Sequence, residues 1–393
     1  MELPRDALPR VPFYRDPKLR GLFLQALLCA AIGLLAYGAI NNAADNLARA
    51  KIASGFGFWN LTAGFDISQT LIDYSSNTST YGRAFWVGLL NTLLVAGLGI
   101  VFATIIGFTV GIARLSKNFL VERLATSYVE LLRNVPLLLQ LLFWYNAVLK
   151  ALPEMAMSLA LPGGFILNNR GLFMPRPLFA SGGEILTVFA GTVTLATVFM
   201  IITGRSERLQ GAFAVRVVGV LMIVIGLPVT AFLATGAPLA FELPEVGRFN
   251  VRGGMEVLPE LAALLFGLSI YTAAFIAEVV RAGLMSVSRG QSEAAQALGL
   301  TRSQTLRLVV IPQAMRVIIP PLTNQYLNLT KNSSLAVAIG YPDLVQIFSG
   351  TVLNQTNQAV EVVTITMAVY LSFSLFTSLV MNMYQSRFAL YER

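Results

Sequence analysis

Residues 85–113 read FWVGLLNTLLVAGLGIVFATIIGFTVGIA and contain no charged side chain. A helix of about 20 apolar residues crosses the hydrocarbon core of a bilayer, which is about 30 Å thick. Because a helix satisfies its backbone hydrogen bonds internally, it can cross this layer without water. The stretch therefore predicts a membrane-spanning helix, and it decides the fold class.

Similar apolar stretches recur along the chain of 393 residues, of which 55% are hydrophobic and only 12% are charged. An average soluble domain has about 25% charged residues. We therefore expect an all-α integral membrane protein with about eight transmembrane helices. The predicted spans are residues 21–40, 85–113, 121–149, 184–203, 215–235, 257–287, 317–340 and 361–384.

The distribution of positive charge predicts the orientation of these spans. With the N-terminus inside, most of the 28 Lys and Arg residues fall in segments on the cytoplasmic side. Lys and Arg are enriched in cytoplasmic loops. We therefore expect both termini in the cytoplasm, and we attribute the net charge of +8 to topology and not to nucleic-acid binding.

Residues that carry catalytic chemistry are scarce. The chain has no His and one Cys, Cys29, and none of its Lys residues follows Gly. His is a common general base and metal ligand, and a phosphate-binding loop of the Walker type ends in Gly-Lys-Ser or Gly-Lys-Thr. The sequence therefore predicts no catalytic residue, no metal site and no nucleotide site in this chain.

A polar, helix-prone stretch, residues 288–312, separates the sixth and seventh predicted spans. Ser288 and Thr301 each begin a Ser/Thr-x-x-Gln capping box, which marks a helix N-terminus. Gly299 fits a left-handed C-cap, and Pro312 is expected to end the second helix. We therefore predict two short helices hinged at Gly299.

The first of these short helices has a surface suited to docking. Ala294, Ala295 and Ala297 are small enough to let another protein approach closely. Glu293 lies near the positive N-terminus of the helix. An amphipathic hairpin on the membrane surface would also have this pattern. A helix-turn-helix DNA-binding unit fits less well, because both flanks enter the membrane and leave no third helix to build its core.

The stretch EAAQALGLTRSQTLRLVVIP resembles the loop signature of the permease subunits of ATP-binding-cassette importers. Three further stretches resemble the polar amino-acid branch of that family: AFIAEVVRAGLMSVSRGQ, PQAMRVIIPPLTNQYLNLTKNSSLAVAIGYPDL and ELLRNVPLLLQLLFWY. Residues 49–95 resemble the larger permease of general L-amino-acid uptake systems, of the glutamate, glutamine, aspartate and asparagine type. The chain departs from the branch at Asn332, where Asp is usual, so an acidic partner beside Lys331 is missing.

The resemblance implies a five-helix importer permease core with added segments. Combined with the predicted spans, it places a cytoplasmic segment at 1–20, an extra first span at 21–40 and a periplasmic loop at 41–84. The core spans follow within 85–149, and residues 150–256 form an insertion with two spans and periplasmic loops. The second part of the core is 257–393, which includes the cytoplasmic loop 288–312.

The resemblance also implies a function, namely a non-catalytic permease subunit that moves polar L-amino acids across the bacterial inner membrane by alternating access. The implied partners are a homologous second permease, a cytoplasmic ATPase dimer that binds ATP and Mg, and a periplasmic amino-acid-binding protein. The first short helix would dock on the ATPase through Gln291, Glu293, Ala294, Ala295, Ala297, Leu298, Gly299 and Leu300. The alternative is a carrier driven by an ion gradient, although no Asp lies within a predicted span.

Two pairs of opposite charge lie within or at the ends of predicted spans, where ionisable groups are read as functional. Glu130 and Arg133 are three residues apart, as are Glu278 and Arg281. This spacing puts both members of a pair on one helical face, where they can neutralise each other. Structural pairing and contact with substrate both remain open for these residues.

The seventh predicted span contains Pro320 and Pro321, which should kink or unwind it. Unwound backbone at membrane depth is tolerated only beside protein or a water-filled cavity. Amides and hydroxyls there would offer the donors and acceptors that a zwitterionic amino acid needs. The expected substrate pathway is Gln140, Tyr271, Asn324, Asn328, Lys331, Ser333 and Ser334. Because any one amide could instead join two helices, the prediction concerns the cluster.

Overall fold

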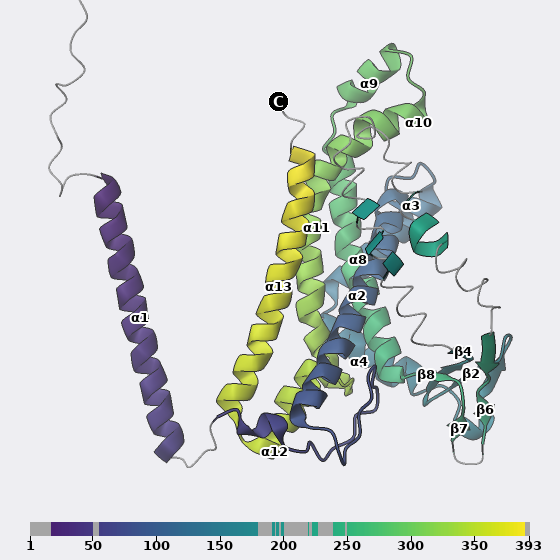
Figure 1. The fold of residues 1–393 in the computed structure, drawn as a ribbon. Helices are drawn as coiled ribbons and strands as arrows, with labels where there is room; N and C mark the ends of the chain where they lie inside the picture. Colours follow the sequence, from purple (N-terminus) through teal and green to yellow (C-terminus); the bar gives the residue numbers. More distant parts are fainter. Residues whose placement is uncertain are drawn as a thin grey trace, which may run out of the picture. The chain divides into compact units, whose positions relative to one another are not determined.

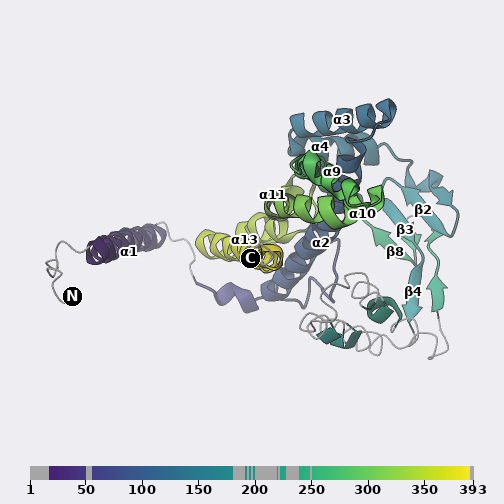
Figure 2. The ribbon, with the colours of Figure 1, turned by 90° about the horizontal axis from the view of Figure 1, so that it is seen from above.

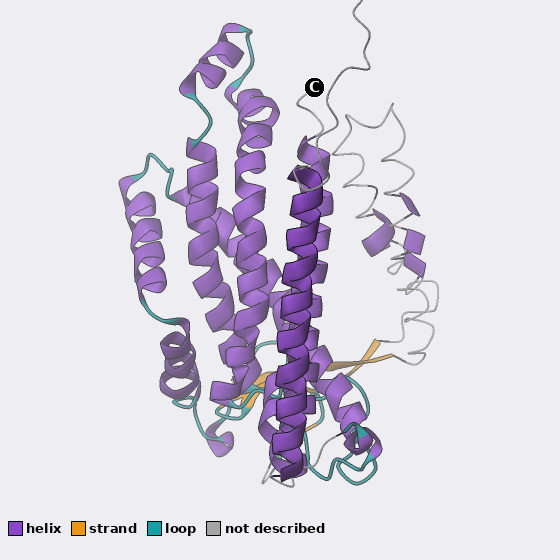
Figure 3. Ribbon diagram, turned by 90° about the vertical axis from the view of Figure 1, so that its left-hand side faces the viewer, coloured by secondary structure: helices purple, strands orange, loops and turns teal. Residues whose placement is uncertain are grey.

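The computed structural model describes residues 17–49, 55–179, 239–247 and 250–389, with a few residues between 191 and 226. In this part of the chain, helices predominate over short strands (Figure 3). Among the described residues, five helices are long and apolar enough to cross a membrane: Arg20–Ala39, Tyr81–Ala113, Pro259–Met285, Arg302–Ile339 and Ala359–Met383. Figure 1 shows how these helices lie in the fold. The predicted helical membrane fold is confirmed. The predicted spans 184–203 and 215–235 lie almost entirely outside the described residues.

The chain divides into two compact units, and the first consists of Met1–Leu94 and Pro342–Arg393. Its helical elements are α1 (Pro17–Arg49), η2 (Gly57–Asn60), the first part of α2 (Tyr81–Ala113), η9 (Val345–Val352), α12 (Leu353–Thr356) and α13 (Ala359–Ala389). Helices α1, α2 and α13 contain the first, second and last candidate spans.

Aromatic residues form the core of this first unit. The ring of Phe85 lies 5.3 Å from that of Phe348 and 5.2 Å from that of Trp59, and the ring of Phe58 lies 6.0 Å from that of Tyr81, measured between centroids. Such pairs add to the stabilisation that burial of the rings provides. The segment between α1 and α2, predicted only as a loop, is therefore packed onto helices through its aromatic residues.

Buried polar groups hold the turn that precedes η9. The side-chain amide of Asn91 donates to the carbonyl oxygen of Pro342 at 2.8 Å. The carboxyl of Asp343 accepts from the backbone N–H of Gln346 at 2.8 Å and from the hydroxyl of Tyr370 at 3.2 Å. Burial raises the pKa of Asp343 from 3.8 to about 7. In the sequence, Asp343 lies between the last two candidate spans, and its side chain is almost completely buried.

The second unit, Val95–Tyr341, is built around α8 (Pro259–Met285) and α11 (Ile311–Asn332), which pack along each other. A Cβ atom added at Gly283 of α8 would lie 2.3 Å from Cγ1 of Ile318 on α11. A Cβ atom at Gly107 of α2 would lie 2.6 Å from Cβ of Ile276 on α8. Small residues at such contacts let helix backbones approach closely in a membrane, where van der Waals packing drives association.

The third predicted span is not one helix. It is divided into α3 (Phe119–Asn134), α4 (Leu137–Leu142) and the π-helical turn η3 (Phe143–Leu149). Val135 has an extended backbone, with φ −103° and ψ 128°. The ring of Pro136 disfavours the α conformation for the residue before it. The helix therefore ends at this proline, which the sequence analysis did not take into account.

The prediction that Pro320 and Pro321 unwind the seventh span is wrong. α11 continues through both prolines, and the regular helix changes to a 3-10 helix, η8 (Ser333–Ile339), only later. The φ angle of proline is compatible with a helix, although its missing N–H removes a hydrogen bond. Packing offsets that loss, because the residues around the prolines include three buried side chains: Ile318, Ile319 and Leu322.

Residues 150–257 contain short antiparallel strands that the sequence analysis did not predict (Figure 2). One sheet has the order β1-β2-β3-β8: β1 (Leu159–Leu161), β2 (Phe165–Asn168), β3 (Gly171–Met174) and β8 (Met255–Val257). The other pairs are β4 (Arg176–Phe179) with β5 (Leu239–Glu242), and β6 (Glu245–Val246) with β7 (Val251–Arg252). The short helical turns η4 (Met155–Met157) and η6 (Met222–Gly226) belong to the same region. Strands of two to four residues are too short for a period-2 pattern to reveal.

Helix α8 separates these strands from the polar segment 288–312. Strand β8 leads directly into the N-terminus of α8, and α9 (Arg289–Ala297) follows its C-terminus. The strands and the polar segment therefore lie at opposite ends of α8 (Figure 1). If one end faces the cytoplasm, the other faces the outside.

Candidate coupling segment and polar sites

The polar segment forms two short helices, α9 (Arg289–Ala297) and α10 (Arg302–Thr305). Gly299 between them has φ +80°, as the predicted left-handed C-cap requires. Thr301 forms the predicted capping box: its N–H donates to the side-chain oxygen of the Gln three residues later at 2.8 Å, and its hydroxyl accepts that residue's N–H at 3.4 Å. Two local signals, a glycine and a capping box, therefore fix the hinge.

The capping box predicted at Ser288 is wrong. Ser288 is the N-cap of α9, but its side chain makes no capping hydrogen bond. The side chain of Gln291, which the box would have used, instead accepts a hydrogen bond from Nε2 of Gln313 at 3.2 Å. This contact joins α9 to α11 and replaces the local cap.

Pro312 also does not end the second short helix, contrary to the prediction. Helix α10 continues through the π-helical turn η7 (Leu306–Val310) into α11. Pro312 occupies the first turn of α11. The φ angle of proline is compatible with a helix, so the continuing helix holds Pro312 at the loss of one hydrogen bond.

Most of the predicted coupling residues are exposed, namely Gln291, Glu293, Ala294, Ala297, Leu298 and Gly299. Leu298 is 82% exposed, and Leu300 is half-buried. Ala295 is only 4% exposed and its carbonyl accepts the N–H of Leu300, so it faces inward and is not available for docking as predicted. The exposed surface of α9 is therefore apolar at its C-terminal end and polar elsewhere.

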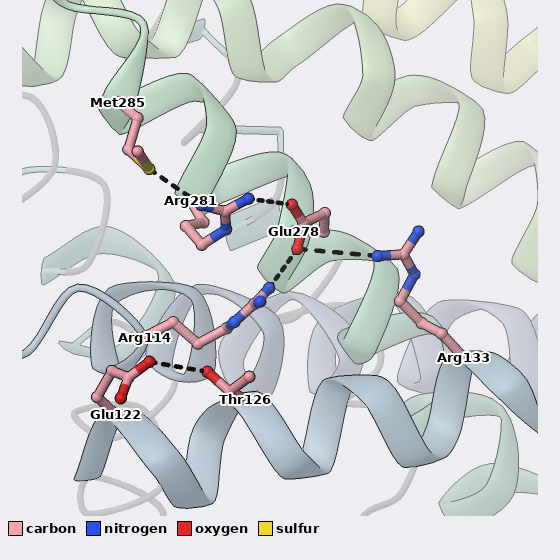
Figure 4. A network of polar contacts seen from close by, with 7 residues as sticks. All are labelled: Arg114, Glu122, Thr126, Arg133, Glu278, Arg281 and Met285. Carbon is pink, nitrogen blue, oxygen red and sulfur yellow. Dashed lines mark hydrogen bonds and ion pairs between the residues drawn. The ribbon is translucent and has the colours of Figure 1, made fainter. Parts of the chain in front are cut away.

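A cluster of charged side chains joins α8 to α3 and to the end of α2 (Figure 4). Nη2 of Arg281 donates to Oε1 of Glu278 at 2.6 Å, Nη1 of Arg114 donates to Oε2 of Glu278, and Nη1 of Arg133 lies 3.8 Å from the same Oε2. In the described part of the chain, Glu130 forms no ion pair. The predicted pairing of Glu130 with Arg133 is therefore wrong, because Arg133 turns toward Glu278.

The sequence does not predict that Arg114 belongs to this cluster. Arg114 directly follows α2, where a basic residue indicates only the inner side of the membrane. Its side chain is 11% exposed and contacts a carboxylate more than 160 residues away in sequence. The sequence does show that Glu278 and Arg281 lie near the end of their span, where a further charged partner can reach them. No local sequence pattern shows that this partner is Arg114.

A cavity of about 350 Å³ lies against this cluster, between α3 and α8. Its lining residues are Arg114, Val129, Glu130, Arg133, Asn134, Phe275, Glu278 and Arg281. Cζ of Arg133 lies 5.2 Å from the centroid of the Phe275 ring, which places the guanidinium over an aromatic face. No group of acidic, His or Cys side chains among the described residues could hold a metal ion.

Three of the predicted substrate residues share one exposed face of α11. Asn324, Asn328 and Lys331 are spaced by four and three residues on this helix, and all three are exposed. Residues at this spacing are neighbours on a helix surface. None of the three side chains makes a hydrogen bond or ion pair with another described residue. The face therefore presents uncompensated polar groups within a candidate span.

The other predicted substrate residues are not on this face. The amide of Gln140 donates to the carbonyl oxygens of Leu132 and Val135, both at 2.9 Å, so it caps the C-terminus of α3. The hydroxyls of Ser333 and Ser334 donate to carbonyl oxygens of the preceding turn, at 2.8 and 2.7 Å. The ring of Tyr271 lies 5.0 Å from that of Phe275. The two serines and Gln140 thus bond to backbone within the chain.

Comparisons with known proteins agree with this architecture. Residues 99–390 match the family model described as "Binding-protein-dependent transport system inner membrane component". The chain is 50% identical to the general L-amino acid transport system permease protein AapQ of Rhizobium johnstonii, over 96% of this chain and 94% of that protein. It is 49% identical to the putative amino-acid ABC transporter permease protein YhdX of Escherichia coli, over 97% of each.

A further relative is the glutamate/glutamine/aspartate/asparagine transport system permease protein BztB of Rhodobacter capsulatus, 38% identical over 96% of each chain. The family model covers most of the described helices, and these relatives extend the match to nearly the whole length. The chain therefore belongs to the family of binding-protein-dependent transport system inner membrane components, among the amino-acid permeases of ATP-binding-cassette transporters.

Proposed function

We propose that this chain forms the membrane path of an ATP-driven importer that moves polar L-amino acids across the bacterial inner membrane by alternating access. The printed names of its relatives, which refer to general L-amino acids and to glutamate, glutamine, aspartate and asparagine, support the substrate class. The chain itself contributes no catalytic group. A separate ATPase dimer binds ATP and Mg and hydrolyses the ATP.

The observation that carries this proposal is the exposed segment α9–α10. Leu298 is 82% exposed beside the hinge at Gly299, next to the exposed Ala294 and Ala297, and the rest of the exposed surface of α9 is polar. Ala294, Ala297 and Leu298 form a small exposed apolar patch that no described residue covers, which favours a protein partner. We assign this surface to the ATPase, and the positive-inside rule then places both termini in the cytoplasm.

The exposed polar face of α11 supports a path through the membrane. Unpaired polar side chains facing lipid are costly, and they generally face protein or a water-filled cavity. Asn324, Asn328 and Lys331 therefore line a surface shared with a second, homologous permease and with the transported amino acid. A periplasmic amino-acid-binding protein delivers that solute at the opposite end of α8, where the strands lie.

The test reconstitutes the full chain with its ATPase, second permease and binding protein in liposomes and measures uptake of a labelled L-amino acid. Leu298→Asp should reduce ATP-coupled uptake by roughly tenfold or more, because it places a charge in a contact that loses water on docking. Leu120→Asp is the matched control, since Leu120 is 63% exposed at the start of α3, and it should retain uptake.

Two outcomes would contradict the proposal. Retained ATP-coupled uptake in Leu298→Asp would remove α9–α10 as the docking site. Accumulation of the amino acid by the permeases alone, driven by an ion gradient without the ATPase, would favour a secondary carrier instead.

A further inference from the structure

We propose that the cavity between α3 and α8, here named the arginine pocket, binds a phosphate-type oxyanion. The pocket is lined by Arg114, Arg133 and Arg281 together with Glu130 and Glu278. The phosphate can be supplied by the headgroup of an anionic lipid or by free inorganic phosphate. This site is separate from the α9–α10 surface and from the polar face of α11.

The charges of the pocket favour an anion. Three guanidinium groups converge on the single carboxylate of Glu278, which can neutralise only one of them. Glu130 also lines the pocket and pairs with no described cation. Since the three Arg outnumber the two Glu, the lining has a net positive charge. Placing like charges this close is unfavourable unless an anion offsets the repulsion.

The hydrogen-bond inventory leads to the same conclusion. Each guanidinium has five N–H donors, and Glu278 has two oxygens with which to accept them. Nε of Arg114 and Nε of Arg281 are buried and have no hydrogen-bond partner among the described residues. The cluster therefore has far more donors than acceptors. The oxygens of a phosphate accept bidentate hydrogen bonds from Arg, which suits such a surplus.

The size and position of the pocket suit a phosphate group. Its volume of about 350 Å³ is at the lower end for small-molecule sites. Arg114 directly follows α2, and Arg281 lies in the last turns of α8, close in sequence to α9. Helix ends of this kind lie near the level of the lipid headgroups, where basic pockets between helices bind phospholipids.

Arg133 is the most informative residue to change. Its guanidinium is 40% exposed and reaches Glu278 only at 3.8 Å, whereas Arg114 and Arg281 hold that carboxylate more closely. Arg133→Gln therefore removes a ligand for the anion while leaving the closer ion pairs intact. Arg123→Gln is the matched control, since Arg123 is an exposed residue of the same helix outside the pocket lining.

Glu130→Gln tests the sign of the effect. The Glu130 carboxylate is exposed and unpaired among the described residues, so its loss should not disturb the fold. Removing a negative charge from the lining should tighten binding of an anion. A variant that binds more strongly cannot be explained by misfolding, and it keeps the proposal testable if Arg133→Gln is unstable.

The experiment uses the full chain in its transporter complex, held in phosphatidylcholine nanodiscs at constant ionic strength. Three probes are titrated: short-chain phosphatidylglycerol, inorganic phosphate and L-glutamate. Native mass spectrometry and thermal melting report binding. We expect Arg133→Gln to weaken phosphatidylglycerol binding roughly tenfold, Glu130→Gln to strengthen it about fivefold, and Arg123→Gln to leave it unchanged.

The probes distinguish the source of the phosphate. Binding of phosphatidylglycerol alone assigns the site to a lipid headgroup, and binding of inorganic phosphate as well shows that the phosphate group suffices. The proposal is overturned if neither probe binds above the phosphatidylcholine background, or if Arg123→Gln and Arg133→Gln weaken binding equally. It is also overturned if only L-glutamate binds in an Arg133-dependent manner, because the pocket would then hold the transported solute.

Discussion

Two neighbouring regions of the chain differ in what covers them. One is the core formed by α8 with α11, and the other is the segment α9–α10 that connects these two helices. In the core, Gly283 meets Ile318 with no room for another atom. In the segment, Leu298 is 82% exposed and a Cβ atom at Gly290 would meet nothing within 4 Å. The chain stabilises the first region by its own contacts and leaves the second uncovered. Substitutions in the core should therefore alter folding, and substitutions in the segment should alter transport.

The largest expected effect comes from introducing the same side chain into both regions. Gly283→Leu would force its Cβ to within 2.3 Å of Cγ1 of Ile318, and overpacking of this kind costs about 1–3 kcal/mol or more. We expect a large loss of monodisperse protein and a lower melting temperature in detergent. Gly290→Leu is the control and should melt like the wild type. Equal melting temperatures of the two variants would contradict the conclusion that only the first region is tightly packed.

The next effect concerns the hinge of the segment. Gly299 has φ +80°, where Val is strained and Asn is tolerated. Gly299→Val should reduce ATP-coupled uptake roughly tenfold by misplacing α9, while the melting temperature stays near that of the wild type. Gly299→Asn should retain most of the uptake. If Val and Asn behave alike in the uptake assay, the hinge geometry is not what matters.

A smaller, several-fold loss of uptake is expected on the polar face of α11. Asn328→Leu and Lys331→Met remove exposed groups that have no partner among the described residues, so protein stability should be little changed. Thr323→Val on the same helix is the control, because its hydroxyl already donates to the carbonyl of Ile319 at 3.0 Å. Initial rates of uptake measure the effect. Normal rates in both test variants would move the substrate path elsewhere.

The last prediction concerns stability and not transport, and it extends the comparison to a buried polar group of the first unit. The carboxyl of Asp343 has its ordinary pKa of 3.8 when unfolded and a pKa of about 7 when folded, raised by burial. Between these values the folded protein holds a proton that the unfolded protein has released, so stability falls as pH rises from about 4 to about 7 and then levels off. Melting curves across this range should show the decline.

Asp343→Asn should weaken this pH dependence, because an amide does not titrate and its oxygen can still accept the N–H of Gln346. Uptake per folded protein should be unchanged. A wild type whose melting temperature rises over the same pH range would contradict the assignment.

The two proline sites show how far local signals extend. Pro136 ends α3, whereas α11 runs through Pro320 and Pro321. The chemical signal is the same in both places. Buried side chains flank both sites, Leu137 and Leu141 at the first and Ile318 and Leu322 at the second. The difference is that the amide of Gln140 donates to the carbonyl oxygens of Leu132 and Val135 and so satisfies the end of α3. A proline therefore marks a point of weakness, and the surrounding contacts decide whether the helix breaks there.

The sequence by itself determined the helical membrane class and the described spans at α1, α2, α8 and α13. It also determined the left-handed turn at Gly299 and the capping box at Thr301. These features depend on hydrophobicity along a continuous segment or on residues within one turn. A single element contains all the information that they need.

Only the tertiary structure decided that Ala295 faces inward, that Gln140 caps α3 and that Arg114 and Arg133 turn toward Glu278. It also decided the pairing of strands far apart in sequence, such as β3 with β8. Each of these features depends on contacts between elements, and no periodic pattern in the sequence indicates which elements meet. Their partners are set by how the helices pack, since packing brings a side chain within reach of one neighbour and away from another.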